Sequence, residues 1–268
     1  MLQFFQNAYR QWWLKRHPIN DELWLPLTTM PILRGLSGDE LQRLKALAAW
    51  FLHTKAISAA KGIEFSDPMR LVLAVQAVLP ILNLGFDAYD DWQEIIIYPS
   101  QFVTPTRERD HHGFVHEGEQ VLAGQARSDG PVLLSWHDVM EAPWQDGFNV
   151  VIHELAHKLD MRNGFPNGNP PLHHGMNQKH WQAAFSHAFI DLQQKADRGE
   201  YSPIDLYAAT NAAECFAVCS EVFFEDPHTL LDTYPAVYEQ LKLFYRQDPQ
   251  SRLPRVGYRP YFADAVVH

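Results

Sequence analysis

Apolar residues recur every three or four positions in two stretches near the start of the chain, which is the spacing of one buried helix face. The first stretch follows a capping box, Ser37 with Glu40 three residues later, and continues to Phe51. The second begins at Asp67, ahead of a proline, and continues to Leu79. These patterns predict two amphipathic helices in the N-terminal part of the chain.

The pattern changes between Gln93 and Ser135. Short β-branched runs there are separated by Pro99, by Pro105 and by the turn-forming residues 128–130. This spacing predicts strands and a hairpin, with strands expected at 95–98, 120–126 and 131–135.

Helical spacing returns after residue 148, in segments 148–159, 181–194 and 207–217, with a loop rich in Asn, Gly and Pro at 163–175. Strands followed by helices predict an α+β fold with a small mixed sheet. No internal repeat or low-complexity segment appears, so we expect one domain over residues 1–268. It would comprise a mainly helical part (1–90), a core (91–250) and an extended tail (251–268) whose Tyr258, Tyr261 and Phe262 pack back on the core.

The segment around 153–157 carries the pentapeptide His153-Glu154-Leu155-Ala156-His157. Four residues advance a helix by about one turn, so both imidazoles lie on one face and can bind one metal ion. Glu154 lies beside that pair, where it can reach a metal-bound water without ligating the metal. The motif predicts a zinc hydrolase with Glu154 as general base, and the alternative is an ordinary buried helix with two histidines.

A catalytic zinc site needs a third protein ligand and one open position. The best candidate is Glu214, which follows a predicted N-cap at Thr210 or Asn211 and lies among small residues that allow close approach. Glu221 lies seven residues further along the same face. It is a substitute ligand or, alternatively, a solvated carboxylate near the helix end.

The strand expected at 131–135 has a further possible use. As an edge strand above a zinc site, it would hold an extended peptide by backbone pairing. Trp136, His137 and Asp138 follow it and either line the approach to the metal or close the end of the strand.

Composition restricts the function further. The formal charge of −10 argues against a nucleic-acid binder, because phosphate contacts need a basic surface. Cys215 and Cys219 lie four apart on one predicted helix, where disulfide geometry is poor, so we expect buried thiols and a reducing compartment. No apolar run approaches the roughly 20 residues of a membrane span and no signal-peptide core is evident, which favours the cytoplasm.

The first residues are aromatic, and two roles remain open for them. They would form a helix that packs on the core or an amphipathic helix at a membrane surface, although the few basic residues predict weak lipid attraction. The residues concerned are Phe4, Phe5, Tyr9, Trp12 and Trp13, followed by Lys15 and Arg16.

Two resemblances follow from these motifs. Residues 153–157 together with 207–214 resemble the zinc-binding arrangement of the anthrax lethal factor catalytic domain, a zincin whose third ligand is a glutamate. Nearly the whole chain is similar to the bacterial Mlc titration factor A family. The second resemblance rests on the aromatic N-terminal segment, the predicted strands at 95–99, 124–126 and 130–136, and the helix end at 220–224.

The resemblances imply a zincin-like fold with one zinc ion, held by His153, His157 and Glu214. They also imply that Tyr207 donates its hydroxyl to the developing oxyanion. His111, His112 and His116 form a cluster in which the first two are expected to lie in a solvated loop. The resemblance suggests that His116 reaches the zinc, and we expect it to cap the metal in a resting state and to swing away before hydrolysis. One departure is Val218, where lethal factor carries another acidic residue, so support for the ligands is expected to differ.

These features predict a zinc metallopeptidase that cleaves a peptide or an aminoacyl amide, and the resemblance favours aminopeptidase substrates. The resemblance also implies a cytoplasmic partner, the repressor Mlc, whose sequestration raises expression of the glucose phosphotransferase system. An acidic surface suits contact with a basic DNA-binding protein. The alternative is a non-catalytic zinc protein that acts only by sequestering the repressor.

Overall fold

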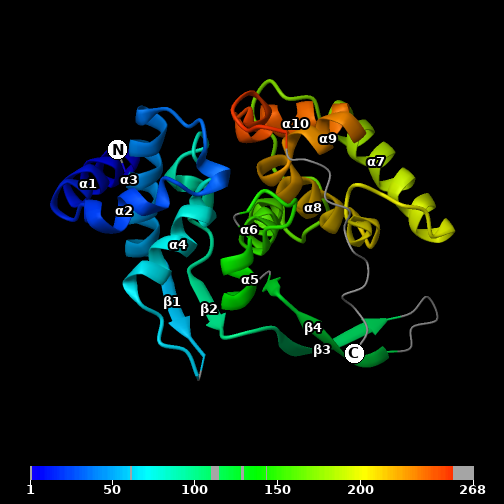
Figure 1. Ribbon diagram of the computed structural model, residues 1–268, viewed down its shortest axis with the longest axis horizontal. Coiled ribbons are helices and arrows are strands. Elements are labelled where there is room, and N and C mark those ends of the chain that lie inside the picture. Colours follow the sequence, from blue (N-terminus) through cyan, green and yellow to red (C-terminus); the bar gives the residue numbers. More distant parts are fainter. Residues whose placement is uncertain (1, 61, 110–114, 128–129, 143, 256–268) are drawn as a thin grey trace.

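Helices make up most of the computed structural model, which describes residues 2–60, 62–109, 115–127, 130–142 and 144–255, and the labelled strands lie in the lower part of the view (Figure 1). The described chain mixes α-helices with strands, which confirms the α+β expectation. Figure 1 shows the N-terminal helices on one side, the C-terminal helices on the other and α6 between them. The predicted tail aromatics Tyr258, Tyr261 and Phe262 lie outside the described residues.

The N-terminal helices begin where their caps predict. The Ser37 backbone N–H donates to Glu40 Oε2 at 2.8 Å, and the Glu40 N–H donates to Ser37 Oγ at 3.3 Å, so the capping box is present. The helix starts at Gly38 and Asp67 are therefore confirmed. The elements are α1 (Leu2–Arg16), α2 (Asp21–Leu27), the 3-10 turn η1 (Pro31–Leu33), α3 (Gly38–Thr54) and α4 (Asp67–Val78).

Helix α1 packs against α3, which is one of the two roles open to it. The Trp13 ring meets the Trp50 ring edge-on with centroids 5.9 Å apart. Arg10 forms an ion pair with Asp87 at 2.7 Å, which ties the helix to the turn after α4. Several aromatic side chains of α1 nevertheless stay largely exposed: Phe5, Tyr9 and Trp12.

The main sheet is mixed, with the strand order β1-β2-β6-β5. The first three strands are parallel, whereas β5 pairs antiparallel with β6; β1 and β5 form the two edges. The expectation of an edge strand at 131–135 is therefore wrong, because β6 lies between two partners and all of its residues are buried. The strands are β1 (Ala56–Ala59), β2 (Glu94–Tyr98), β5 (Gly124–Ala126) and β6 (Val132–Ser135).

A two-stranded antiparallel sheet of β3 (Phe102–Arg109) and β4 (Val115–Leu122) extends from the body (Figure 1). Pro105 lies within β3 instead of ending it, which is tolerated because both strands of such a ribbon are edges. The strand predicted at 120–126 is divided between β4 and β5, which belong to different sheets.

Most of the remaining chain is helical. Trp136 begins α5 and meets Phe65 edge-on at 5.3 Å, so it closes the end of β6. Cys215 and Cys219 are free and buried, as expected. No helix in the described ranges has the length and apolarity needed to cross a membrane. The helices are α5 (Trp136–Glu141), α6 (Val150–Asp160), α7 (Gln178–Arg198), α8 (Ala212–Glu225), α9 (Pro227–Thr233) and α10 (Pro235–Tyr245), with 3-10 turns η2 (Phe86–Tyr89), η3 (Met161–Asn163), η4 (Leu206–Ala209) and η5 (Pro249–Ser251).

Candidate metal centre

Helix α6 carries both motif histidines at the centre of the molecule. It starts at Asn149, whose Oδ1 accepts the Ile152 N–H at 3.0 Å, and every residue from Val150 to Asp160 is buried. His153 and His157 lie one turn apart, and their Nε2 atoms approach to 3.2 Å. The helical spacing read from the sequence therefore brings the two imidazoles together.

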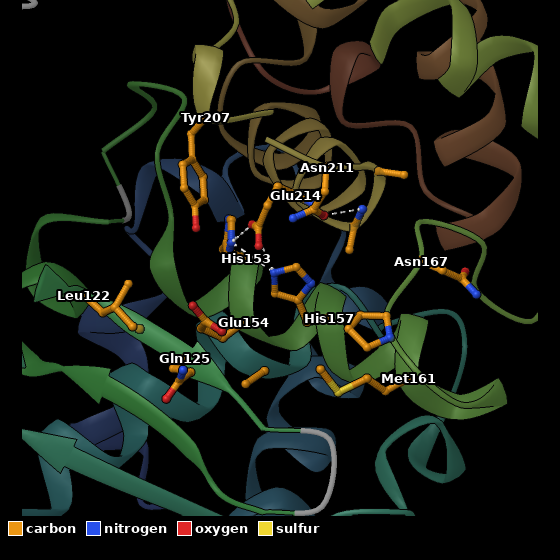
Figure 2. A pocket seen from close by; sticks show the side chains of 15 residues that line it. Leu122, Gln125, His153, Glu154, His157, Met161, Asn167, Tyr207, Asn211 and Glu214 are labelled. Carbon is orange, nitrogen blue, oxygen red and sulfur yellow. Dashed lines mark hydrogen bonds and ion pairs between the residues drawn. The ribbon is translucent and has the colours of Figure 1, made fainter. Parts of the chain in front are cut away.

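Helix α8 brings Glu214 to the same point (Figure 2). The N-cap is Asn211, whose Oδ1 accepts the Glu214 N–H at 3.0 Å. Glu214 Oε2 lies 3.0 Å from His153 Nε2 and 3.3 Å from His157 Nε2. One ligand atom from each of these three side chains lies within 4.8 Å of the others.

The spacing of these donors fits a tetrahedral ion. Two donors bound at about 2.0–2.1 Å and separated by a tetrahedral angle lie roughly 3.3 Å apart. The distances between the two Nε2 atoms and Glu214 Oε2 are 3.0, 3.2 and 3.3 Å. Two imidazoles and one carboxylate also form a donor set that suits zinc.

The carboxylates and histidines of the cluster shift one another's pKa values. Burial acts to lower the pKa of His153, but the charge of Glu221 and hydrogen bonds with Glu214 and Glu221 outweigh it and raise that pKa well above its usual value. Burial acts to raise the pKa of Glu214, yet hydrogen bonds with His153 and His157 bring it to about 2. Glu214 is therefore ionised at neutral pH, as a metal ligand must be.

Glu221 has a role that the sequence did not predict. It is only 3% exposed, so it is not a solvated carboxylate, and its Oε1 lies 2.7 Å from Nδ1 of His153, on the side away from the ligand cluster. Such a carboxylate fixes the orientation and tautomer of a metal-binding histidine. Val218 is buried and apolar, so this support comes from a residue nearly one turn further along α8.

Glu154 lies in the wall of the site, under strand β5. The strand comes so close that a Cβ on Gly124 would lie 2.6 Å from Glu154 Oε1, and the Ala126 backbone N–H donates to the carboxylate. Burial raises the pKa of Glu154, while the charges of His153 and His157 oppose the rise. A raised pKa favours a carboxylate that exchanges protons near neutral pH.

An open cavity of about 540 Å³ gives access to these groups. Tyr207 lines it, with its ring 6.0 Å from the His153 ring, and Figure 2 shows its hydroxyl directed into the cavity. Tyr207 belongs to the turn η4, which precedes the Glu214 helix and its N-cap Asn211. Burial, followed by the charge of Glu214, raises its pKa, so the hydroxyl keeps its proton at neutral pH.

Comparison with known proteins identifies the family. The profile described as glucose-regulated metallo-peptidase M90 matches residues 5–246. The chain belongs to this M90 family. Two proteins named Mlc titration factor A, from Yersinia pestis and Yersinia pseudotuberculosis, are each 41% identical to it over 236 residues, which cover 87% of this chain and 87% of each relative. The resemblance to the Mlc titration factor A family is thereby confirmed.

Pro166 and Asn167, in the predicted loop at 163–175, line the M90 cavity, a role that the sequence did not indicate. Asp160, at the end of α6, accepts the backbone N–H groups of Asn167 at 2.6 Å and Gly168 at 2.7 Å. Gly168 has a positive φ of 74°, and a Cβ there would lie 2.4 Å from the Ala212 carbonyl oxygen. The loop therefore joins the end of α6 to the start of α8, and only glycine fits at the junction.

The remaining histidine predictions for this M90 protein concern residues 111–116. His111 and His112 lie outside the described residues, and so does the side chain of His116. The backbone of His116 lies within β4, opposite Glu108 in the ladder, and not before the strand as expected. Trp136, His137 and Asp138 begin α5 directly after β6 and are not among the described residues that line the cavity.

Proposed function

We propose that the protein is a zinc metallopeptidase with a zincin-like fold, in which His153, His157 and Glu214 hold one zinc ion. The observation that carries the proposal is the convergence of these three donors from α6 and α8 beside the buried carboxylate of Glu154. A site that only stabilises the fold has no need of that carboxylate or of an open cavity. Membership of a metallopeptidase family supports the same reaction class.

The bound zinc would supply Lewis-acid polarisation of the scissile carbonyl and of the attacking water. Glu154 would accept the proton of that water and later transfer it to the leaving amine. Tyr207 would donate its hydroxyl hydrogen to the oxyanion that develops on the substrate. The proton remains available because the pKa of Tyr207 is raised.

The substrates we propose are peptides or aminoacyl amides, cleaved as by an aminopeptidase in the cytoplasm. His116 would cap the zinc as a fourth ligand in a resting state and withdraw before hydrolysis. A His116→Ala variant should then turn over faster than the wild type. Equal or slower turnover by a zinc-loaded variant would remove His116 from this role.

The deciding experiment uses zinc-loaded wild type and Glu154→Ala on a panel of aminoacyl and peptide amides, with bound zinc quantified in both. Loss of hydrolysis with zinc retained is the expected result. Removal of zinc by a chelator should abolish wild-type activity, and added zinc should restore it. A fully zinc-loaded wild type that cleaves nothing on the panel would contradict the proposal.

A second function concerns the repressor Mlc. Relatives at 41% identity are named Mlc titration factor A, and the formal charge of −10 suits a basic DNA-binding partner. We propose that the chain binds Mlc and so modulates expression of the glucose phosphotransferase system. The alternative is that this is its only function. Glu154→Ala distinguishes the two: in a bifunctional protein it should bind Mlc as the wild type does while losing hydrolysis.

A further inference from the structure

Helix α8 carries two more buried glutamates beyond the candidate ligand, Glu221 and Glu225, one turn apart. Both reach across to the segment that leads into α6. Glu221 Oε2 accepts the Asn149 backbone N–H at 2.6 Å, and Glu225 Oε2 accepts the Gln145 backbone N–H at 2.6 Å. Two carboxylates of α8 thus accept hydrogen bonds from two backbone amides that directly precede α6.

Asn149 completes this connection with its side chain. Its Nδ2 donates to Glu225 Oε1 at 2.8 Å and lies 3.2 Å from Gln76 Oε1 on α4, while its Oδ1 caps α6. Asn149, Gln76 and Glu225 are all fully buried. The cost of burying their polar atoms is offset because the groups bind one another.

The backbone around this connection is also constrained. Gln145 has a φ of 60°, in the left-handed region that residues other than glycine rarely adopt. Its N–H is the group that Glu225 accepts. A strained residue persists where its surroundings determine its conformation, and a buried carboxylate bound to its amide does so here.

We propose that Asn149 and Glu225 are positioning residues of the metal centre. They fix how α6 sits against α8, and so hold Glu221 on Nδ1 of His153 and Glu214 on the Nε2 atoms. The inference rests on the proposed zinc function. A shift of one residue between the helices moves the donors by about 1.5 Å, which is far outside the tolerance of a zinc site.

The alternative is a buried polar network that stabilises the fold without regard to the ligands. It predicts lower stability in variants and unchanged metal binding. The proposal predicts that metal binding changes more than the lost stability explains. The two therefore separate in a measurement of zinc affinity beside a stability control.

Two conservative variants weaken the hydrogen bonds between Glu225 and the segment that precedes α6. Asn149→Ser keeps a side chain that caps α6 but lacks the Nδ2 donor that reaches Glu225. Glu225→Gln keeps the shape but turns an amide NH₂ group towards one of its two donors. The control is Tyr245→Phe, which removes a buried hydrogen bond of 2.9 Å to Ser220 Oγ on the same helix and leaves the hydrogen bonds of Asn149 and Glu225 in place.

The measurements are the zinc dissociation constant by competition with a chromogenic chelator, and the visible spectrum of the Co²⁺-substituted protein. We expect zinc affinity about tenfold or more below wild type in both variants, with an altered Co²⁺ spectrum. The zinc affinity of the double variant should be little lower than that of the single variant that binds zinc less tightly, since the two residues act as a unit. Tyr245→Phe should stay within about twofold of wild type.

The inference is overturned if both variants keep wild-type zinc affinity and Co²⁺ spectrum while losing stability as Tyr245→Phe does. If Glu225→Gln does not fold, Asn149→Ser alone provides the test, because it keeps the N-cap of α6. A wild type that binds no zinc would overturn the proposed function, and this inference with it. An inactive wild type that binds zinc would count against the peptidase alone, because no readout here depends on hydrolysis.

Discussion

The Nδ1 atom of His153 lies 2.7 Å from Oε1 of Glu221, so a carboxylate from α8 binds the rear of a histidine on α6. The same helix presents Glu214 to the front of that imidazole at 3.0 Å. His153 is therefore held from both sides by one helix. The orientation of this imidazole depends on α8 as much as on α6.

Replacing Glu221 by Gln should weaken zinc binding by about 10- to 100-fold, because the histidine loses the carboxylate that orients it. The measurement is zinc affinity by chelator competition. Glu239→Gln, at an exposed position of α10, removes the same charge and should leave the affinity unchanged. Equal zinc affinity in the two variants would contradict the role given to Glu221.

Gly124→Ala should displace the proposed base. The added Cβ would lie 2.6 Å from Glu154 Oε1 and 2.8 Å from a methyl carbon of Val150, so the carboxylate must move. A misplacement of about 1 Å can cost roughly 10²-fold in rate, so we expect a fall of that order in kcat with zinc retained. Gly38→Ala, where nothing lies within 4 Å, is the control and should be fully active. Normal kcat in Gly124→Ala would show that Glu154 tolerates the shift.

Tyr207→Phe tests the proposed oxyanion donor. Loss of one such donor costs about 10² to 10³ in kcat, and we expect a fall in that range. Tyr207 is 41% exposed, so stability should change by less than about 0.5 kcal/mol. Tyr9→Phe, remote and half-exposed, should behave as wild type. A raised KM with unchanged kcat would instead assign Tyr207 to substrate binding.

Lys55 should make stability depend on alkaline pH. Its ammonium donates to the carbonyls of Tyr89 and Trp92, and burial lowers its pKa to about 8, against a partial opposing effect of Asp90 and Asp91. Below pH 8 both folded and unfolded chains hold the proton. Between pH 8 and the usual 10.5 only the unfolded chain holds it, so the free energy of unfolding should rise with pH in that window.

Urea unfolding of wild type and Lys55→Met from pH 7 to 10 measures this effect. The methionine variant lacks the titrating group, so the wild type should gain stability relative to it above pH 8. A constant difference across the range would mean that Lys55 titrates near its usual pKa in the folded protein.

The helices and the core of the site were predictable because their signals are local. An i,i+4 spacing places His153 and His157 on one face in any helix, and a capping box fixes a helix start. Glu214 followed from small neighbours that allow close helix packing. The contact between Glu221 and His153 was not predictable. The seven-residue spacing places Glu214 and Glu221 on the same face of α8, but it does not say which atom of His153 each carboxylate contacts.

The sheet order depends on longer-range structure, whereas the place of Tyr207 depends on local caps. The two edge strands, β5 with three residues and β1 with four, are too short to show a clear period of apolar residues. Tyr207 lies in a separate turn because the Asp205 carboxylate accepts its N–H at 2.8 Å, and a new helix begins only after Asn211. The N-cap expected at Thr210 or Asn211 is confirmed at Asn211, so the helix proper begins after Tyr207.

Helix α8 carries Glu214, Glu221 and Glu225 at intervals of seven and four residues. At about 100° per residue these side chains fall within roughly 20° of one line along the helix. Insertion or deletion of a single residue between Glu214 and Glu221 would rotate the first carboxylate by about 100° relative to the other two. The number of residues between these glutamates is therefore fixed by the geometry of the site.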